Sequence, residues 1–187
     1  WMLGKAGYFD QSYHVPLIIR DPRQEADAMR GREVGAFTEH VDIMPTLLDA
    51  LGAEVPVQCD GLALTPFLHA GDAPGWRQHA HWEFDFRDAS FDGVEKSLGL
   101  TLHQCNLSVI RGERYKYVQF AGLPPLLFDL EKDPGEFTNL AERDDHASIA
   151  FRHAQALLSW RQTHEDQTLT HMMATAKGLA ARPGKRF

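Results

Sequence analysis

A short, almost continuous apolar segment near the start of the sequence restricts the fold more than any other feature. Residues 13–20 read Tyr-His-Val-Pro-Leu-Ile-Ile-Arg, and four of these eight side chains are aliphatic. Such a run is typical of a strand that is covered on both faces, and Pro16 indicates that the strand lies at a sheet edge or begins there. Because one such strand cannot form a doubly wound sheet, we expect it to complete a larger sheet whose other strands lie elsewhere.

A one-sided helix is predicted after this strand. Apolar residues recur at helical spacing over residues 41–51, Asp42 can cap the first turn, and Gly52 is a typical stop. Residues 53–75 are rich in Gly and Pro and predict a loop with one helical turn near residues 64–68. The apolar face of the helix, like the strand, needs a partner surface.

The second part of the chain predicts an antiparallel sheet. Residues 81–86 alternate polar and aromatic side chains, which indicates a half-buried strand. Residues 107–111 and 115–120 flank a short turn and are rich in β-branched and aromatic side chains, so they predict a hairpin. Residues 126–130 form a further short strand. The weakly patterned stretch 88–102 is expected to be a loop.

A long amphipathic helix is predicted over residues 145–163. The polar, basic segment beyond it is expected to lack regular structure unless a neighbouring chain holds it. The chain therefore divides into residues 1–75, the end of a main α/β domain; residues 76–164, an antiparallel sheet with its helix; and residues 165–187, a tail expected in oligomer contacts.

Composition argues against several functions. The formal net charge is −7 and the sequence pI is about 5.8, which disfavours a nucleic-acid partner. No apolar run approaches the ~20 residues that span a bilayer, so we expect no membrane partner, and we expect no export signal because no charged-then-apolar leader is visible. Two cysteines are too few for a disulfide framework.

Two groups of residues could carry chemistry by themselves. His79, His81 and Glu83 alternate along a strand and could hold a metal ion, although a hydrogen-bonded polar strand face is the better interpretation. Cys105 follows His103 by two residues, and an imidazole near the thiol could lower its pKa. A thiol enzyme would also need an oxyanion site, which the sequence does not indicate.

The remaining candidates are weaker. Cys59 lies in a polar loop, His14 is expected to be a satisfied side chain of the strand, and His164 and His171 are expected at the surface. No nucleophile elbow, P-loop or dinucleotide fingerprint is present. Lys5 could bind an anionic oxygen, although a solvated lysine is the simpler interpretation from the residue alone.

Several stretches, in register over nearly the whole chain, resemble the C-terminal part of the sulfatases of the alkaline phosphatase superfamily. The stretches that carry this resemblance are Leu3-Gly4-Lys5, residues 14–20, residues 41–49 with Gly52, Asp60-Gly61 with residues 64–68, and residues 114–117, 127–130, 133–136 and 138–140. A closer resemblance, to the phosphonate monoester hydrolases, rests on residues 83–88, 120–126, 158–161 and 168–171.

The resemblance implies an α/β fold of the alkaline phosphatase type: the end of the large mixed sheet, with a small antiparallel sheet packed by a long C-terminal helix. It implies a formylglycine nucleophile and a divalent metal ion (manganese, calcium or zinc) whose ligands lie outside this chain. It also implies that Lys5 binds the anionic centre of a small ester and stabilises charge in the transition state. A cytoplasmic homo-oligomer such as a tetramer is a further expectation.

The sequence also departs from the family pattern. Neither cysteine is followed by x-Pro-x-Arg, the metal-binding Asp-His pair is expected upstream of Trp1, and His14 stands where many sulfatases have arginine. We therefore expect a C-terminal fragment of a hydrolase of phosphonate monoesters, phosphodiesters or sulfate esters, inactive without the N-terminal half that is its partner. The alternative is a non-catalytic packing or assembly module from a truncated or split gene.

Overall fold

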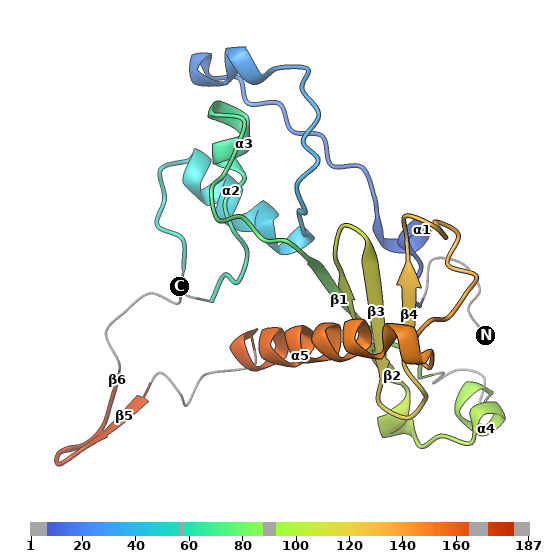
Figure 1. Cartoon of the computed structure of the whole chain (residues 1–187). Helices are drawn as coiled ribbons and strands as arrows, with labels where there is room; N and C mark the ends of the chain where they lie inside the picture. The colour runs from blue at the N-terminus through green and yellow to red at the C-terminus, as the bar shows by residue number, and fades with distance from the viewer. Residues whose placement is uncertain (1–6, 57, 88–92, 165–171, 182–187) are drawn as a thin grey trace. The chain divides into compact units, whose positions relative to one another are not determined.

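Two compact units make up the chain. Trp1–Ile19 and Arg77–Leu158 form unit one, and Arg20–Trp76 with Ser159–Phe187 form unit two. The computed structural model, drawn in colour in Figure 1, describes residues 7–56, 58–87, 93–164 and 172–181.

Unit one contains a four-stranded antiparallel sheet. Strands β1 (Ala80–Asp85), β2 (Asn106–Arg111), β3 (Tyr115–Phe120) and β4 (Leu126–Asp129) lie side by side in sequence order (Figure 1). Each strand pairs with the next one along the chain. The strands and the hairpin predicted from residue alternation are therefore confirmed, because period-two patterns bury one face of a sheet without help from distant residues.

The core lies against one face of this sheet. Val109 of β2 stands opposite Val118 of β3 and Trp82 of β1, so large apolar side chains share that face. Burial of each such side chain stabilises the fold by about 1.5–3 kcal/mol. The buried members of this cluster are Phe86, Cys105, Leu107, Val109, Val118, Phe120 and Phe128.

Short helices surround the sheet. They are α1 (Asp10–Tyr13), α4 (Val94–Leu98) and the 3₁₀ turns η3 (Leu102–Gln104) and η4 (Asp144–His146). The prediction of a loop over residues 88–102 is thus wrong for α4. That helix has five residues, too few to show periodicity, and it ends at Gly99, whose positive φ of 67° stops it.

Helix α5 (Ala147–His164) confirms the long helix predicted near the end of the chain. Its first part crosses the sheet in Figure 1, where His153 packs against Tyr115 of β3 with ring centroids 5.9 Å apart. Leu157 is buried, as expected, but Phe151 is 63% exposed and Leu158 is also exposed. The apolar stripe is wider than the surface that the described residues offer to cover it.

The Arg20–Trp76 part of unit two is built from short helices. These are η1 (Gln24–Met29), η2 (His40–Asp42), α2 (Ile43–Ala50) and α3 (Thr65–His69). Helices α2 and α3 confirm the predicted helix and helical turn, and Gly52 ends the first with a φ of 66°.

Asp42 does not have the predicted role as the cap of α2 and instead connects two neighbouring loops. Its carboxylate does not cap the first turn of α2. One oxygen accepts from the Glu39 N–H and the other from the Leu62 N–H, each at 2.8 Å. Gly61 passes so close to this turn that a β-carbon there would lie 2.0 Å from the Val41 carbonyl oxygen. Asp42 and Gly61 together join the following loop to the start of the helix.

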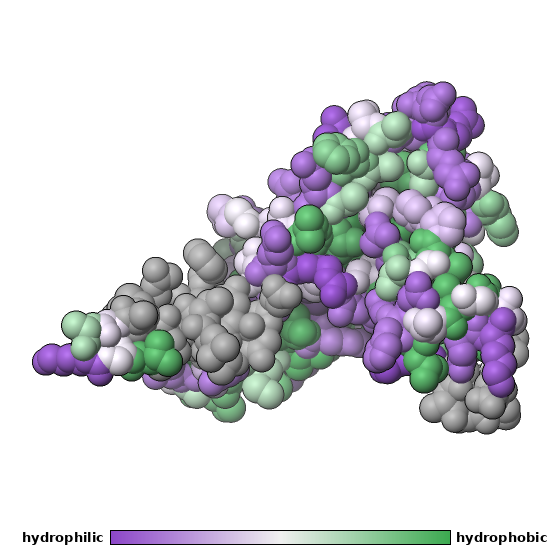
Figure 2. Space-filling model, turned by 90° about the horizontal axis from the view of Figure 1, so that it is seen from below, coloured by the Kyte–Doolittle hydropathy of each residue, from purple (hydrophilic) through white to green (hydrophobic). Residues whose placement is uncertain are grey.

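The apolar segment 13–20 does not form the predicted strand. Tyr13 ends α1, and residues 14–20 have no regular secondary structure and pair with no strand among the described residues. Ile18 is 90% exposed, and Leu51 at the end of the α2 stripe is 81% exposed. Hydrophobic residues also reach the surface of the face shown in Figure 2. A strand needs a neighbour to satisfy its backbone, and no described residue supplies one here.

The tail contains a hairpin that its composition did not predict. Strands β5 (Met172–Thr175) and β6 (Gly178–Ala181) pair antiparallel around a tight turn. Residues 165–171 and 182–187 lie outside the described residues. Among the helices that are described, none combines the length and apolar character needed to cross a bilayer.

Candidate functional site

Lys5 is the one residue to which the family resemblance assigns a chemical role. It lies outside the described residues, so this role stays a prediction. The segment that follows it is described from residue 7 onward, and residues 8–13 are fixed to the sheet of unit one by an unusual set of contacts.

A fully buried lysine is at the centre of these contacts. Lys116 of β3 donates from Nζ to the Tyr8 carbonyl oxygen at 2.9 Å and to Asp10 Oδ1 at 3.0 Å. Its third partner is Glu136, whose side chain is also fully buried. Lysine and glutamate are almost never fully buried unless they are paired. Each of these two side chains is therefore tolerated in the interior because the other one is there.

Asp10 joins the same network from the other side. Its Oδ2 accepts from Arg111 Nε at 3.3 Å, and its backbone N–H donates to Glu136 Oε1 at 3.1 Å. The network thus contains two cations and two carboxylates and is neutral as a whole. The cations are Lys116 and Arg111, and the carboxylates are Asp10 and Glu136. A balanced, hydrogen-bonded network is the condition under which buried charges are tolerated.

Aromatic rings pack residues 8–13 against the core of unit one. Tyr8 stacks on Phe128 with ring centroids 6.0 Å apart, and Tyr13 stacks on Trp82 at 4.9 Å. Burial, and secondarily the charge of Glu136, raise the pKa of Tyr8 above its ordinary value. Residues 8–13 are thus held by charge at Asp10 and by apolar contact on either side of it.

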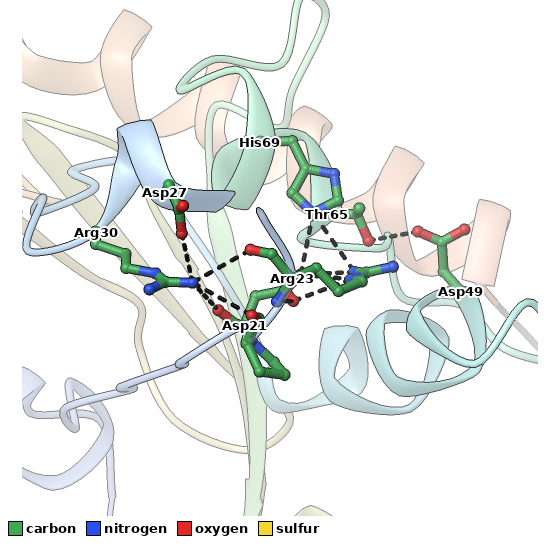
Figure 3. A network of polar contacts seen from close by, with 8 residues as sticks. Asp21, Arg23, Asp27, Arg30, Asp49, Thr65 and His69 are labelled. Carbon is green, nitrogen blue, oxygen red and sulfur yellow. Dashed lines mark hydrogen bonds and ion pairs between the residues drawn. The ribbon is translucent and has the colours of Figure 1, made fainter. Parts of the chain in front are cut away.

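A second polar cluster, in unit two, is shown in Figure 3. Arg23 forms a two-point ion pair with Asp21, with Nε 2.9 Å from Oδ1 and Nη2 2.6 Å from Oδ2. His69 Nε2 lies 3.0 Å from Asp21 Oδ2. The Arg23 hydrogen bonds, with that of His69, hold the pKa of the Asp21 carboxyl far below its usual range.

This second cluster has the properties of a structural clamp. Arg30 donates to the carbonyl oxygens of Asp21, Pro22 and Arg23 and also pairs with Asp27. Asp21 is almost fully buried, and its oxygens are already engaged. The contacts tie the loop that contains η1 to α3.

The histidine-rich strand face does not form a metal site in the described residues. The His79 and His81 rings lie 6.2 Å apart, and Glu83 accepts a hydrogen bond from the Ser108 hydroxyl at 3.1 Å. No group of three His, Cys, Asp or Glu side chains in the described ranges could hold an ion. Burial, followed by repulsion from His81 and His153, lowers the pKa of His79.

The thiol hypothesis is contradicted for Cys105. Its side chain is fully buried, its Sγ donates to the Thr101 carbonyl oxygen at 3.4 Å, and burial raises its pKa. A raised pKa disfavours the thiolate that a nucleophile needs, so the lowering by His103 that the sequence left open does not occur. Cys59 is half-buried, and both cysteines are free.

Three further histidines were candidates in the sequence. His14 is exposed, so the expectation of a satisfied side chain within a strand is wrong. His164 stacks on Trp160 with centroids 4.8 Å apart near the end of α5. His171 lies outside the described residues.

The sequence analysis missed the buried network around Lys116. One signal was available: Lys116, Val118 and Phe120 have the same parity in a predicted strand, so the lysine had to share a face with core residues. The partners could not be found in this way, because Asp10 and Glu136 lie 106 and 20 positions away.

Comparison with known proteins places the chain in a family. The family model described as N-sulphoglucosamine sulphohydrolase, C-terminal, matches residues 2–163. The chain belongs to this family and, through it and the relatives below, to the alkaline phosphatase superfamily.

Individual relatives agree with this assignment. The multifunctional alkaline phosphatase superfamily protein PehA of Trinickia caryophylli is 47% identical over 97% of this chain and 35% of its own length. The phosphonate monoester hydrolase of Agrobacterium radiobacter is 53% identical, with a TM-score of 0.86, over 98% of this chain and 36% of its own. An arylsulfatase of Clostridium perfringens is 31% identical over 74% of this chain and 25% of its own.

The share of each relative that is covered shows which part of these proteins the chain matches. It spans about a third of the length of the first two relatives and corresponds to their C-terminal domain. The α/β fold of the alkaline phosphatase type, with the small antiparallel sheet and long C-terminal helix, is confirmed by the structural match.

Proposed function

We propose that the chain is the C-terminal part of a metal-dependent hydrolase of phosphonate monoesters, phosphodiesters or sulfate esters. The observation that supports this most directly is the 53% identity and TM-score of 0.86 to a phosphonate monoester hydrolase over 98% of the chain. Similarity of that degree covers the sheet, the long helix and the segment that carries Lys5 together.

In this proposal the catalytic groups are distributed between this chain and the N-terminal half that is its partner. A formylglycine and a divalent metal ion, manganese, calcium or zinc, belong to the partner half, because neither cysteine has the required motif and the described residues hold no metal-binding group. The metal polarises the ester when it is bound. Lys5, which this chain contributes, binds the anionic oxygen of the ester and stabilises the charge that develops on it.

The exposed apolar surfaces support a missing partner half. The segment 15–19 and the α2 stripe at Met44, Leu47 and Leu51 each leave large aliphatic side chains open to water. Large exposed patches are typical of interfaces. We propose that the N-terminal half covers them, and that the assembled enzyme is a cytoplasmic homo-oligomer such as a tetramer in which the tail contacts a neighbouring subunit.

The competing proposal is a non-catalytic packing or assembly module. It is favoured by two observations: burial raises the pKa of the Cys105 thiol, and the described residues contain no metal-binding group. The two proposals differ in whether Lys5 contributes to turnover once the partner half is present.

The test compares this chain alone with a chimera that joins it behind the N-terminal two thirds of the Agrobacterium radiobacter enzyme. Hydrolysis of an aryl phosphonate monoester and an aryl sulfate is measured with added manganese. We expect no turnover by the chain alone, turnover by the chimera, and a loss of about 10²–10³ in kcat for Lys5→Ala in the chimera. A folded chimera that is inactive, or unaffected by Lys5→Ala, would favour the assembly module.

A further inference from the structure

We propose that His79 and His153 form a pH-sensitive contact, which holds the first part of α5 on the sheet at neutral pH and releases it at mildly acid pH. His79 lies directly before β1, and His153 lies in the part of α5 that belongs to unit one. The inference uses contacts within unit one and does not depend on the proposed function.

The two imidazole rings meet edge to face between the strand and the helix. Their centroids lie 6.3 Å apart with an interplanar angle of 88°. The His153 ring also lies 5.9 Å from the ring of Tyr115 in β3. Since both ring contacts pass through His153, a charge on this imidazole acts directly at the point where the helix meets the sheet.

A hydrogen bond within α5 determines which nitrogen of His153 gains a proton. Nδ1 lies 2.9 Å from the Ile149 carbonyl oxygen, one turn earlier in the helix. A carbonyl oxygen can only accept, so Nδ1 carries the hydrogen in the neutral ring. Protonation therefore takes place at Nε2 and charges the ring without breaking the bond that orients it.

The ring of His79 is confined beside the hairpin turn. A β-carbon at Gly112 would lie 3.1 Å from His79 Cδ2, so the ring packs closely against the backbone of that turn. Burial, followed by repulsion from His81 and His153, lowers the pKa of His79 below its ordinary value of 6.5. The docked helix thus favours the neutral form of His79.

Release of α5 would uncover apolar side chains of the sheet. Tyr115, which His153 contacts, shares one face of β3 with Tyr117, because side chains alternate along a strand. Tyr117 stands opposite Ile110 of β2 and Leu127 of β4. All three of these side chains are buried. Since cross-strand partners point to the same face, the helix lies over an apolar surface that mild acid makes accessible.

Other charged and titratable groups lie on the elements that meet at this contact. They are Arg77, His81 and Glu83 in and before β1, Arg114 of the hairpin turn, Tyr115 and Tyr117 of β3, Asp129 of β4, and Arg152 of α5. Asp129 pairs with Arg114 at 2.8 Å, and Glu83 accepts from the hydroxyl of a neighbouring serine. Histidine is the side chain whose charge ordinarily changes between about pH 5 and pH 8, so acid adds positive charge beside the pair.

The direction of the pH effect follows from the lowered pKa of His79. Between this pKa and the ordinary value of 6.5, the released state binds more protons than the docked state. The contribution of His79 to docking is therefore complete above about pH 6.5 and declines as the pH falls below that value. Carboxylates with lowered pKa values lose their contributions only below about pH 5, which separates the two effects.

The test measures amide hydrogen exchange of the 187-residue chain at pH 7.5, 6.5 and 5.5, corrected for the intrinsic pH dependence of exchange. The two segments compared are residues 147–158 of α5 and residues 115–120 of β3. His79→Phe/His153→Phe keeps two aromatic rings in place and removes both titratable groups. His103→Phe changes an exposed histidine of η3 in the same way and is the matched control. His79→Lys places a permanent charge beside His153.

We expect exchange over residues 147–158 of the wild type to accelerate by about tenfold between pH 7.5 and pH 5.5, with β3 changing by less than about twofold. The double variant should change by less than about twofold over the same range, and His103→Phe should behave like the wild type. His79→Lys should exchange at pH 7.5 about as fast as the wild type does at pH 5.5.

Two results would overturn the inference. The first is exchange over residues 147–158 of the wild type that does not change with pH, and the second is full acceleration in the double variant. If the double variant does not fold, NMR titration of the wild type decides. His79 should then titrate below pH 6.5 together with a shift of the Tyr115 ring signals, and titration at or above pH 6.5 would reject the proposal.

Discussion

Charged side chains that are shielded from water lie where distant segments meet. Asp21 connects the loop before η1 to His69 of α3, and Asp129 at the end of β4 pairs with Arg114 of the hairpin turn. Each carboxylate is accessible to water only slightly, and each has a lowered pKa because arginine hydrogen bonds favour its charged form. Asp129 therefore makes the packing within unit one sensitive to acid, and Asp21 does the same within unit two.

Replacement of Asp21 by Asn should lower the melting temperature at pH 7 and reduce its dependence on pH. A carboxylate with a lowered pKa in the folded state contributes stability that is complete above about pH 5 and declines as the pH falls below the unfolded value of about 3.9. Thermal melts from pH 3 to pH 7 measure this. Equal acid sensitivity in wild type and Asp21→Asn would contradict the prediction.

The two cysteines should differ sharply in reactivity. Cys105 is fully buried with a raised pKa, whereas Cys59 is half-buried. Alkylation by iodoacetamide at pH 8, followed by mass spectrometry, should modify Cys59 at least about 100-fold faster, since Cys105 reacts only through opening of the core. Comparable rates would mean that the core around β2 opens readily.

At the scale of single elements, close backbone approach matters as much as side-chain packing. Helix α2 is held at its start by Asp42 and by the passage of Gly61 next to Val41. Helix α5 meets the sheet through His153. Each of these contacts lies within one unit.

Gly61→Ala should therefore destabilise the chain by about 1–3 kcal/mol, because its β-carbon would overlap the Val41 carbonyl group. Gly35→Ala is the matched control: a β-carbon there meets nothing within 4 Å, and its φ is not positive. Urea unfolding of the two variants gives the comparison. A neutral Gly61→Ala would show that the loop after α2 can move away at little cost.

Local pattern explains which elements could be predicted. Strands β1 to β4 and helix α5 have their periodicity within their own residues, so the sequence indicated them. The segment 13–20 has the composition of a strand but depends on a neighbour outside itself, and Asp10 depends on partners more than 100 positions away. Lys5 was found through resemblance alone, and the network that holds residues 8–13 appeared only with the fold.

At the scale of the whole molecule, apolar surface remains open in both units. The chain spans 35% of PehA and 36% of the Agrobacterium radiobacter enzyme. Its exposed aliphatic side chains lie on α2 and in the segment before Asp21. In isolation, this surface favours association between copies.

Met44→Glu/Leu47→Glu should weaken self-association of the isolated chain by about tenfold or more in apparent Kd, because it removes exposed apolar area from α2. Glutamate is a good helix former, so the helix should persist. Sedimentation velocity over a range of concentrations measures the change, and Gln155→Glu on the exposed side of α5 is the control. An unchanged distribution of sedimentation coefficients would show that self-association uses a surface other than α2.

The contacts of Asp10 also have a consequence for the order of events on the ribosome. Its partners Lys116 and Glu136 follow it by 106 and 126 positions. At about 5–20 residues per second, Glu136 is added roughly 6–25 s after Asp10. During that interval residues 8–13 have no anchor, so the native contacts of this segment form only after the turn after β4 has been synthesised.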